Sequence, residues 1–146
     1  MNNDKDWVVL IGRMLLALLF VISGFGKIPG FERTAAHIAS QGLPLPHVLA
    51  ALAVLFELGG GLAIALGWKT RWAAAALALF LIVVTPIFHR FWGGLPPEVA
   101  QNMQVHFMKN VSILGGILVL FAFGPGRFSL DHGDSSAVPR AEAAGG

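Results

Sequence analysis

The sequence contains no cysteine among its 146 residues. Disulfides, thiolate nucleophiles and cysteine-ligated metals are therefore excluded. A self-contained thiol mechanism is excluded for the same reason. Any redox chemistry must come from a bound cofactor or from a partner protein.

Charge is also scarce, since charged residues make up 12% of the chain and hydrophobic residues 55%. Ordinary globular domains carry roughly a quarter charged residues. The net charge of +2 is dispersed and forms no basic stripe, which argues against a nucleic-acid partner. A soluble domain of this size buries only part of its surface and could not hide several long apolar helices. The composition therefore predicts one membrane domain in contact with a lipid bilayer.

The N-terminal apolar run lacks the features of a secretory signal, because its positive charge, Arg13, lies inside the run. We therefore expect a retained first helix and an all-α, four-transmembrane-helix bundle. The expected divisions are a polar N-terminus at 1–6, a membrane domain at 7–128 and a disordered tail at 129–146. Within the membrane domain we expect spans at 7–25, 47–68, 72–88 and 105–123, with an interfacial segment at 31–41 and a helical lead-in from Glu98.

An even number of spans places both ends of the chain on one side of the membrane. The two ends of the chain and the connection between the second and third spans carry Lys5, Lys69, Arg71, Arg127 and Arg140. The other two connections carry Lys27, Arg33 and Arg90. Positive charge accumulates on cytoplasmic loops. The sequence therefore predicts a multi-pass protein of a bacterial inner membrane with both termini in the cytoplasm.

Glu57 lies near the middle of the second span, in the run LAALAVLFELGGGLAIALGW. An ionised side chain at this depth costs roughly 2.5–3.5 kcal/mol on insertion scales, so we expect it to be paired. At 1.5 Å per residue, Arg13 lies about 9 Å inside the cytoplasmic end and Glu57 about 16 Å. Lys109 lies in the fourth span, near the opposite face of the membrane, with His106 and Asn110 beside it. The depths predict one centre built from Arg13, Glu57 and Lys109, which either locks the helices or forms a proton or ligand site.

Small residues at helical spacing indicate close packing around this centre. We expect this packing at Gly24, Gly59, Gly60, Ala63, Gly67, Ser112 and Gly116. Histidines form a further group, since His47, His89 and His106 all fall near the outer face. They could bind haem, a metal or a quinone head group, or simply sit at the interface. Their spacing matches no metal signature, so no metal site is predicted.

The order of these motifs resembles the DoxX family of small bacterial membrane proteins. The resemblance rests on the G-x-x-K at Gly24–Lys27, the loop ending GLPLP, the run ELGGGLAIALGW, and HFMKNVSILGG from His106 to Gly116. It covers about residues 7–130. The resemblance implies a four-helix inner-membrane protein, distantly similar to DoxD-type subunits of thiosulfate:quinone oxidoreductase. It also implies functional positions at Arg13, Gly24, Lys27, Glu57, Gly60, His106, Lys109 and Asn110.

Two functions of different class remain open at this point. The first is a membrane component of an oxidoreductase system that binds quinone or a small anion near Glu57, Lys109 and His106. Here Arg13 and Lys109 would stabilise negative charge and Glu57 would relay a proton. The alternative is a non-catalytic scaffold or assembly partner whose buried ion pairs are purely structural. A small transporter is less favoured, because four helices show no inverted repeat. Catalysis, the substrate, redox partners and the oligomeric state are not determined by the residues.

Overall fold

The computed structural model describes residues 3–135, and this part of the chain is helical with no strand. The elements are α1 (Asn3–Lys27), α2 (Phe31–Ser40), α3 (Pro46–Val54), the π-helical turn η1 (Leu55–Gly59), α4 (Gly60–Leu66), α5 (Thr70–Phe88), α6 (Pro97–Phe123) and α7 (Leu130–Ser135). Four helical stretches are long and apolar enough to cross a membrane, at Asp4–Lys27, Pro46–Leu66, Thr70–Phe88 and Pro97–Phe123. The predicted all-α, four-span architecture is confirmed.

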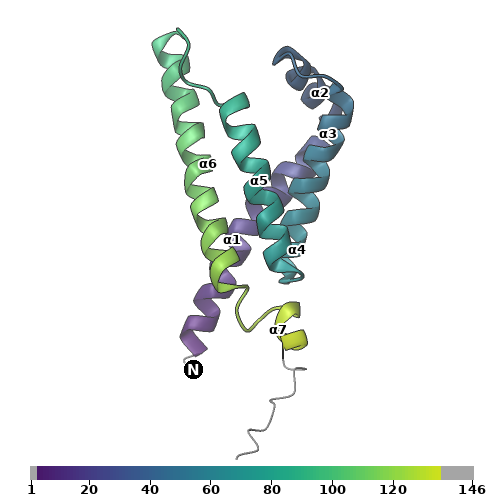
Figure 1. Cartoon of the computed structure of the whole chain (residues 1–146), viewed down its shortest axis with the longest axis vertical. Helices are drawn as coiled ribbons and strands as arrows, with labels where there is room; N and C mark the ends of the chain where they lie inside the picture. Colours follow the sequence, from purple (N-terminus) through teal and green to yellow (C-terminus); the bar gives the residue numbers. More distant parts are fainter. Residues whose placement is uncertain (1–2, 136–146) are drawn as a thin grey trace, which may run out of the picture.

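The four spans form two antiparallel pairs that cross in the lower half of the molecule (Figure 1). Helix α1 packs along α4 and η1, and α5 packs along α6. The short helix α2 lies at the upper end against α3, whereas α7 lies at the lower end below α4 (Figure 1). The first turn of α1 is also at this lower end, because the rings of Trp7 and Phe128 are 4.8 Å apart.

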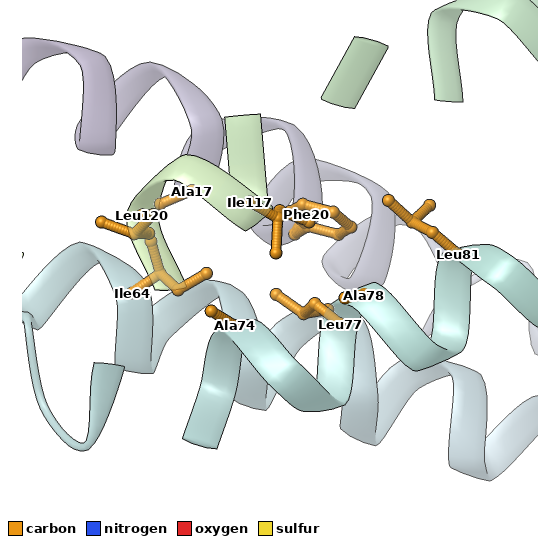
Figure 2. Packing of buried hydrophobic residues seen from close by; sticks show 9 residues of the cluster. All are labelled: Ala17, Phe20, Ile64, Ala74, Leu77, Ala78, Leu81, Ile117 and Leu120. Carbon is orange, nitrogen blue, oxygen red and sulfur yellow. The ribbon is translucent and has the colours of Figure 1, made fainter. Parts of the chain in front are cut away.

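The core lies where the two pairs cross, and all four spans contribute to it (Figure 2). Small residues let the helices approach, and larger side chains fill the space between them. The buried cluster consists of Ala17 and Phe20 of α1, Ile64 of α4, Ala74, Leu77, Ala78 and Leu81 of α5, and Ile117 and Leu120 of α6. A second, smaller cluster joins α2 to α3 through Ala35, Ile38 and Ala50, with Phe88 packed against it.

Most of the remaining apolar surface faces outward. At most a third of the residues in the apolar window of each span are buried, and side chains such as Leu15, Ile22, Leu55 and Phe123 are more than 60% exposed. A soluble protein of this size would not expose so much contiguous apolar surface, whereas a bilayer solvates it. The outward faces of the spans are therefore the lipid-facing surface.

Helix α6 is continuous from Pro97, so the lead-in expected from Glu98 runs into the span expected at 105–123 and the two form one helix of 27 residues. The end of the chain differs from the sequence-based expectation. Disorder was expected from residue 129, but Leu130–Ser135 forms α7, because Asp131 binds the start of α5. Residues 136–146 of that expected tail lie outside the described residues.

Candidate functional sites at the helix interfaces

Arg13 is buried, and backbone carbonyl groups surround its guanidinium. It donates hydrogen bonds to Pro125 O at 2.7 Å, to Phe128 O at 2.5 Å and to Ala65 O at 3.3 Å. The residue is 4% exposed. Carbonyl dipoles thus replace the water that the guanidinium would otherwise bind. Arg13 joins α1 and α4 to the loop that follows α6.

Glu57 is paired with Lys27 instead of with Arg13. Lys27 Nζ lies 2.7 Å from Glu57 Oε2 and donates a second hydrogen bond to Ser23 Oγ at 2.8 Å. The Glu57 side chain is 10% exposed and that of Lys27 26%. Among residues 3–135, Glu57 makes no ion pair with Arg13 or Lys109. The predicted centre of Arg13, Glu57 and Lys109 is therefore wrong as a single cluster.

The antiparallel register of α1 and α4 explains the correction. Gly24 faces Leu58, and Phe20 faces Gly61. The higher-numbered residues of α1 therefore contact the lower-numbered residues of the second span. Glu57 consequently lies level with Lys27, and Arg13 lies level with Ala65. Depths counted from the two helix ends place Arg13 within reach of Glu57 only if those ends are level. The contacts show an offset instead, because Arg13 lies beside Ala65, near the end of α4. Lys27 lies on the same face of its helix as Arg13 and Gly24. This spacing was the sequence signal that could have identified Lys27 as the partner of Glu57.

Glu57 occupies a π-helical turn in the middle of its span. Such turns are rare and are often found at functional sites, because the extra residue re-aims a side chain and frees backbone groups. The turn is held close to α1 by Gly24, where a β-carbon would lie 2.6 Å from Leu58 N. This close approach brings the Lys27 ammonium to the carboxylate.

A second polar contact lies between α5 and α6. Asn110, which is 8% exposed, donates a hydrogen bond from Nδ2 to Thr85 Oγ1 at 3.1 Å. One helical turn away, the rings of His89 and His106 stack with centroids 5.3 Å apart. The two contacts share a register, because His89 follows Thr85 by four residues and His106 precedes Asn110 by four. We call these four residues the α5–α6 polar seam.

A largely apolar groove of about 210 Å³ adjoins the polar seam. Thr85 and Asn110 are the two polar residues of its lining, and both are buried, so nearly all of the surface that faces the groove is apolar. The other lining residues are Leu81, Ile82, Pro86, Phe107, Val111 and Leu114. An apolar slot with one or two polar groups at fixed positions is the usual form of a small-molecule site.

The upper end of the seam is electropositive. Burial lowers the pKa of His89, and the nearby His106, Lys109 and His37 lower it further. His89 is therefore neutral at pH 7, and its Nδ1 is buried with no hydrogen-bond partner among residues 3–135. Lys109 is exposed and acts on the seam through its charge, without a hydrogen bond in the described part of the chain.

The small residues expected to pack lie in several different settings. Gly60 faces Leu77 of α5, a β-carbon at Gly116 would lie 3.5 Å from Leu16 Cδ1 of α1, and Gly67 ends α4 with a φ of +65°. Gly59 and Ser112 are exposed and face no other span, and Ala63 is partly buried. Gly61, next to Gly60, also lies in a close contact with α1, because a β-carbon there would meet Phe20 and Val21 at 3.0 Å.

The remaining histidines do not assemble into a metal site. His47 lies 3.2 Å from Glu32 on the outside of α2 and α3, and the His37 ring packs against Phe88. Within residues 3–135 no group of three or more potential metal ligands comes together. His47 therefore stands apart from the polar seam.

Comparison with known proteins places the chain in a family. The sequence model of the DoxX family matches residues 8–90, which is more than half of the chain. The chain is 39% identical to the inner membrane protein YphA of Escherichia coli, over 86% of this chain and 89% of YphA. It is 37% identical to the inner membrane protein YqjF of the same organism, over 90% of this chain and 95% of YqjF.

More distant similarity extends to eukaryotes. A Surfeit locus protein 4 homolog of Drosophila melanogaster is 26% identical over 90% of this chain, which covers 42% of the Drosophila protein. No solved structure matches the chain. The family match, the similarity to two bacterial inner membrane proteins and the four apolar helices agree, and the chain belongs to the DoxX family as a multi-pass inner membrane protein.

Proposed function

We propose that this DoxX-family protein is a membrane component of a quinone-linked oxidoreductase system and that the quinone head group binds in the groove between α5 and α6. The observation that carries the proposal is the pairing of an apolar groove with the buried amide of Asn110. A quinone is a flat apolar ring with two carbonyl acceptors. Its site therefore needs an apolar slot and hydrogen-bond donors, inside the membrane where the isoprenoid tail is soluble.

The residues of the groove fit this requirement. Among residues 3–135, the Asn110 amide donates one hydrogen bond, to Thr85, and a quinone carbonyl that entered the groove would accept the second. Thr85 holds the amide in place, and neutral His89 lies one turn further towards the membrane surface. A bound quinone would supply two-electron carrier chemistry. In this arrangement Asn110 orients the head group, and His89 and His106 hold or accept a proton near the surface.

Quinone content tests this proposal directly. The protein is purified in mild detergent from bacterial membranes, and organic extracts are analysed for quinones by mass spectrometry and optical spectra. We expect wild type to retain quinone and Asn110→Leu, which keeps the branched shape and the number of side-chain heavy atoms but removes the donor, to lose most of it. Asn102→Leu is the matched control, because Asn102 lies exposed on the same helix. A wild type without quinone, or equal retention by Asn110→Leu, would contradict the proposal.

A second function is favoured by the contacts of two cations inside the spans, the buried Arg13 and the half-buried Lys27. Lys27 pairs with Glu57 and also binds Ser23, and the two terminal nitrogens of Arg13 bind backbone carbonyl groups, while Arg13 Nε has no hydrogen-bond partner among residues 3–135. Contacts of this kind are what a non-catalytic scaffold would need, with ion pairs that only fix the helix register. Under the quinone-linked function, Glu57 would additionally relay protons.

Glu57→Gln and the exchanged pair Lys27→Glu/Glu57→Lys separate the two roles. Glu57→Gln leaves the Lys27 charge without its counter-ion, so we expect a lower folded yield. The exchanged pair keeps opposite charges and is expected to recover much of that yield. If Glu57 also relays protons, quinone-dependent electron transfer stays low in the exchanged pair. Full recovery of both yield and electron transfer would identify the pair as purely structural.

A further inference from the structure

The lower end of the bundle contains an open, basic cavity. It has a volume of about 690 Å³ and lies where the α4–α5 turn meets the loop after α6. Its charged lining residues are Lys69, Arg71, Arg127, Asp6, Asp131 and His132. None of these residues belongs to the polar seam or to the Lys27–Glu57 pair. The cavity is thus separate from the sites discussed so far.

The charge of this lining is positive. Asp131 is already bound by the backbone N–H groups of Lys69 and Thr70, and the positive charge of Arg13 acts on it. Three cations, at Lys69, Arg71 and Arg127, outnumber the two carboxylates, at Asp6 and Asp131. Arg71 makes one long hydrogen bond, 3.4 Å, to Ala122 O, and the Lys69 ammonium lies over the Trp68 ring. In the described part of the chain, Arg127 has no ion pair or hydrogen bond.

The position of the cavity is that of a phospholipid head group. Trp72 and Phe123 line it and are 79% and 86% exposed, which gives it an apolar border at the start of α5 and the end of α6. Trp7 and Trp68 are also half exposed at this end. Tryptophans gather at the head-group level of a membrane, and basic pockets between helix ends bind anionic head groups.

We infer that this cavity binds the phosphate of an anionic glycerophospholipid, with Lys69 and Arg127 contacting the phosphate and Trp72 and Phe123 bordering the acyl chains. A free phosphate ion carries negative charge but has no acyl chains to contact the apolar border of the cavity. A zwitterionic lipid has acyl chains that can contact this border but carries no net charge. The inference rests on the charge and position of the cavity and is independent of the proposed quinone site.

Fluorescence quenching by brominated lipids tests the inference. Trp92 lies in the loop at the other end and is replaced by Phe, which leaves the tryptophans of the lower end to report. The protein is reconstituted in vesicles that contain brominated phosphatidylglycerol, phosphatidylethanolamine or phosphatidylcholine at equal fractions. We expect stronger quenching by brominated phosphatidylglycerol at low salt. We also expect an apparent preference that falls roughly fivefold for each cation removed.

The variants are Lys69→Asn and Arg127→Gln, alone and together, with the folded state checked by circular dichroism. Asn is chosen at position 69 because the backbone there is left-handed, with a φ of 44°. Arg33→Gln/Arg90→Gln is the matched control, since it removes two exposed cations from the opposite end. Retention of the preference by this control supports the inference, and so does its loss in the Lys69→Asn/Arg127→Gln variant.

Three results would overturn the inference. The first is equal quenching by all three lipids, and the second is a preference for phosphatidylethanolamine. The third is displacement of phosphatidylglycerol by millimolar inorganic phosphate as effective as that by added phosphatidylglycerol, which would reassign the cavity to a soluble anion.

Discussion

Arg13 and Lys27 lie on one face of the same helix, yet their charges are accommodated in different ways. Lys27 meets a carboxylate, whereas Arg13 meets three backbone carbonyl groups. The planar guanidinium presents five donors in a fixed fork and can serve several acceptors at once. An ammonium is a compact charge and suits a single carboxylate. The choice of cation at each position therefore follows from the acceptors that the fold provides.

Arg13→Lys keeps the positive charge but cannot reach all three carbonyl groups. Because hydrogen bonds to charged groups contribute about 1.5–3 kcal/mol each, we expect the variant to lose about 2 kcal/mol of stability or more. Thermal unfolding in detergent, followed by circular dichroism, measures the loss. Arg33→Lys, at an exposed position, should change stability by less than about 0.5 kcal/mol. Equal unfolding temperatures for Arg13→Lys and wild type would show that the carbonyl contacts contribute little.

Asp131 couples two elements by binding the first N–H groups of α5. Its oxygens accept hydrogen bonds from Lys69 N at 2.6 Å and Thr70 N at 2.8 Å. Burial alone would raise the pKa of Asp131, but these hydrogen bonds and the charge of Arg13 lower it below its ordinary value of 3.8. A carboxylate at a helix N-terminus also interacts favourably with the helix dipole.

Asp131→Asn should reduce stability at pH 7 by about 1 kcal/mol, a typical contribution of a capping side chain. Since the folded pKa is lower than the unfolded one, the ionised group stabilises the fold fully above the unfolded pKa. That contribution is lost as the pH falls through the folded pKa. Unfolding curves at pH 7 and near pH 3 check this. The advantage of the wild type over Asp131→Asn should shrink in acid, and a constant difference would refute the role of the charge.

The contact between α1 and η1 depends on a glycine. Gly24→Ala would place a β-carbon 2.6 Å from Leu58 N and 2.9 Å from Leu58 Cβ. Overpacking of this kind costs about 1–3 kcal/mol. Gly12 lies on the same helix, and a β-carbon added there would have no neighbouring atom within 4 Å. Gly12→Ala is therefore expected to raise stability by about 0.4–1 kcal/mol. Thermal unfolding of the two variants should move in opposite directions, and a shift of the same sign would disprove the close contact.

Across the whole molecule, the four spans place the first turn of α1 and the loop after α6 at one end (Figure 1). The distribution of Lys and Arg leads us to expect this end in the cytoplasm. Because the chain has no cysteine, single cysteines can be introduced without removing others. Arg90→Cys should react with a membrane-impermeant maleimide in intact E. coli spheroplasts, and Arg127→Cys only after permeabilisation. The opposite pattern would reverse the orientation.

The sequence by itself determined the four apolar helices, because a bilayer admits only segments whose backbone groups are satisfied internally and whose surface is apolar. It also determined that Glu57 needs a partner, since an unpaired charge at that depth is costly. Asn110 was identified as a candidate by its place beside His106 and Lys109, but its contact with Thr85 was not foreseen.

The tertiary structure decided which residues meet. Hydropathy records depth but not the tilt or rotation of a helix, and a π-helical turn leaves no simple sequence signal. Lys27 rather than Arg13 therefore pairs with Glu57, and two of the three carbonyl groups that bind Arg13 come from a loop more than 110 residues away. Because side chains on different spans are brought together by packing alone, their pairing becomes visible only when the register of the helices is known.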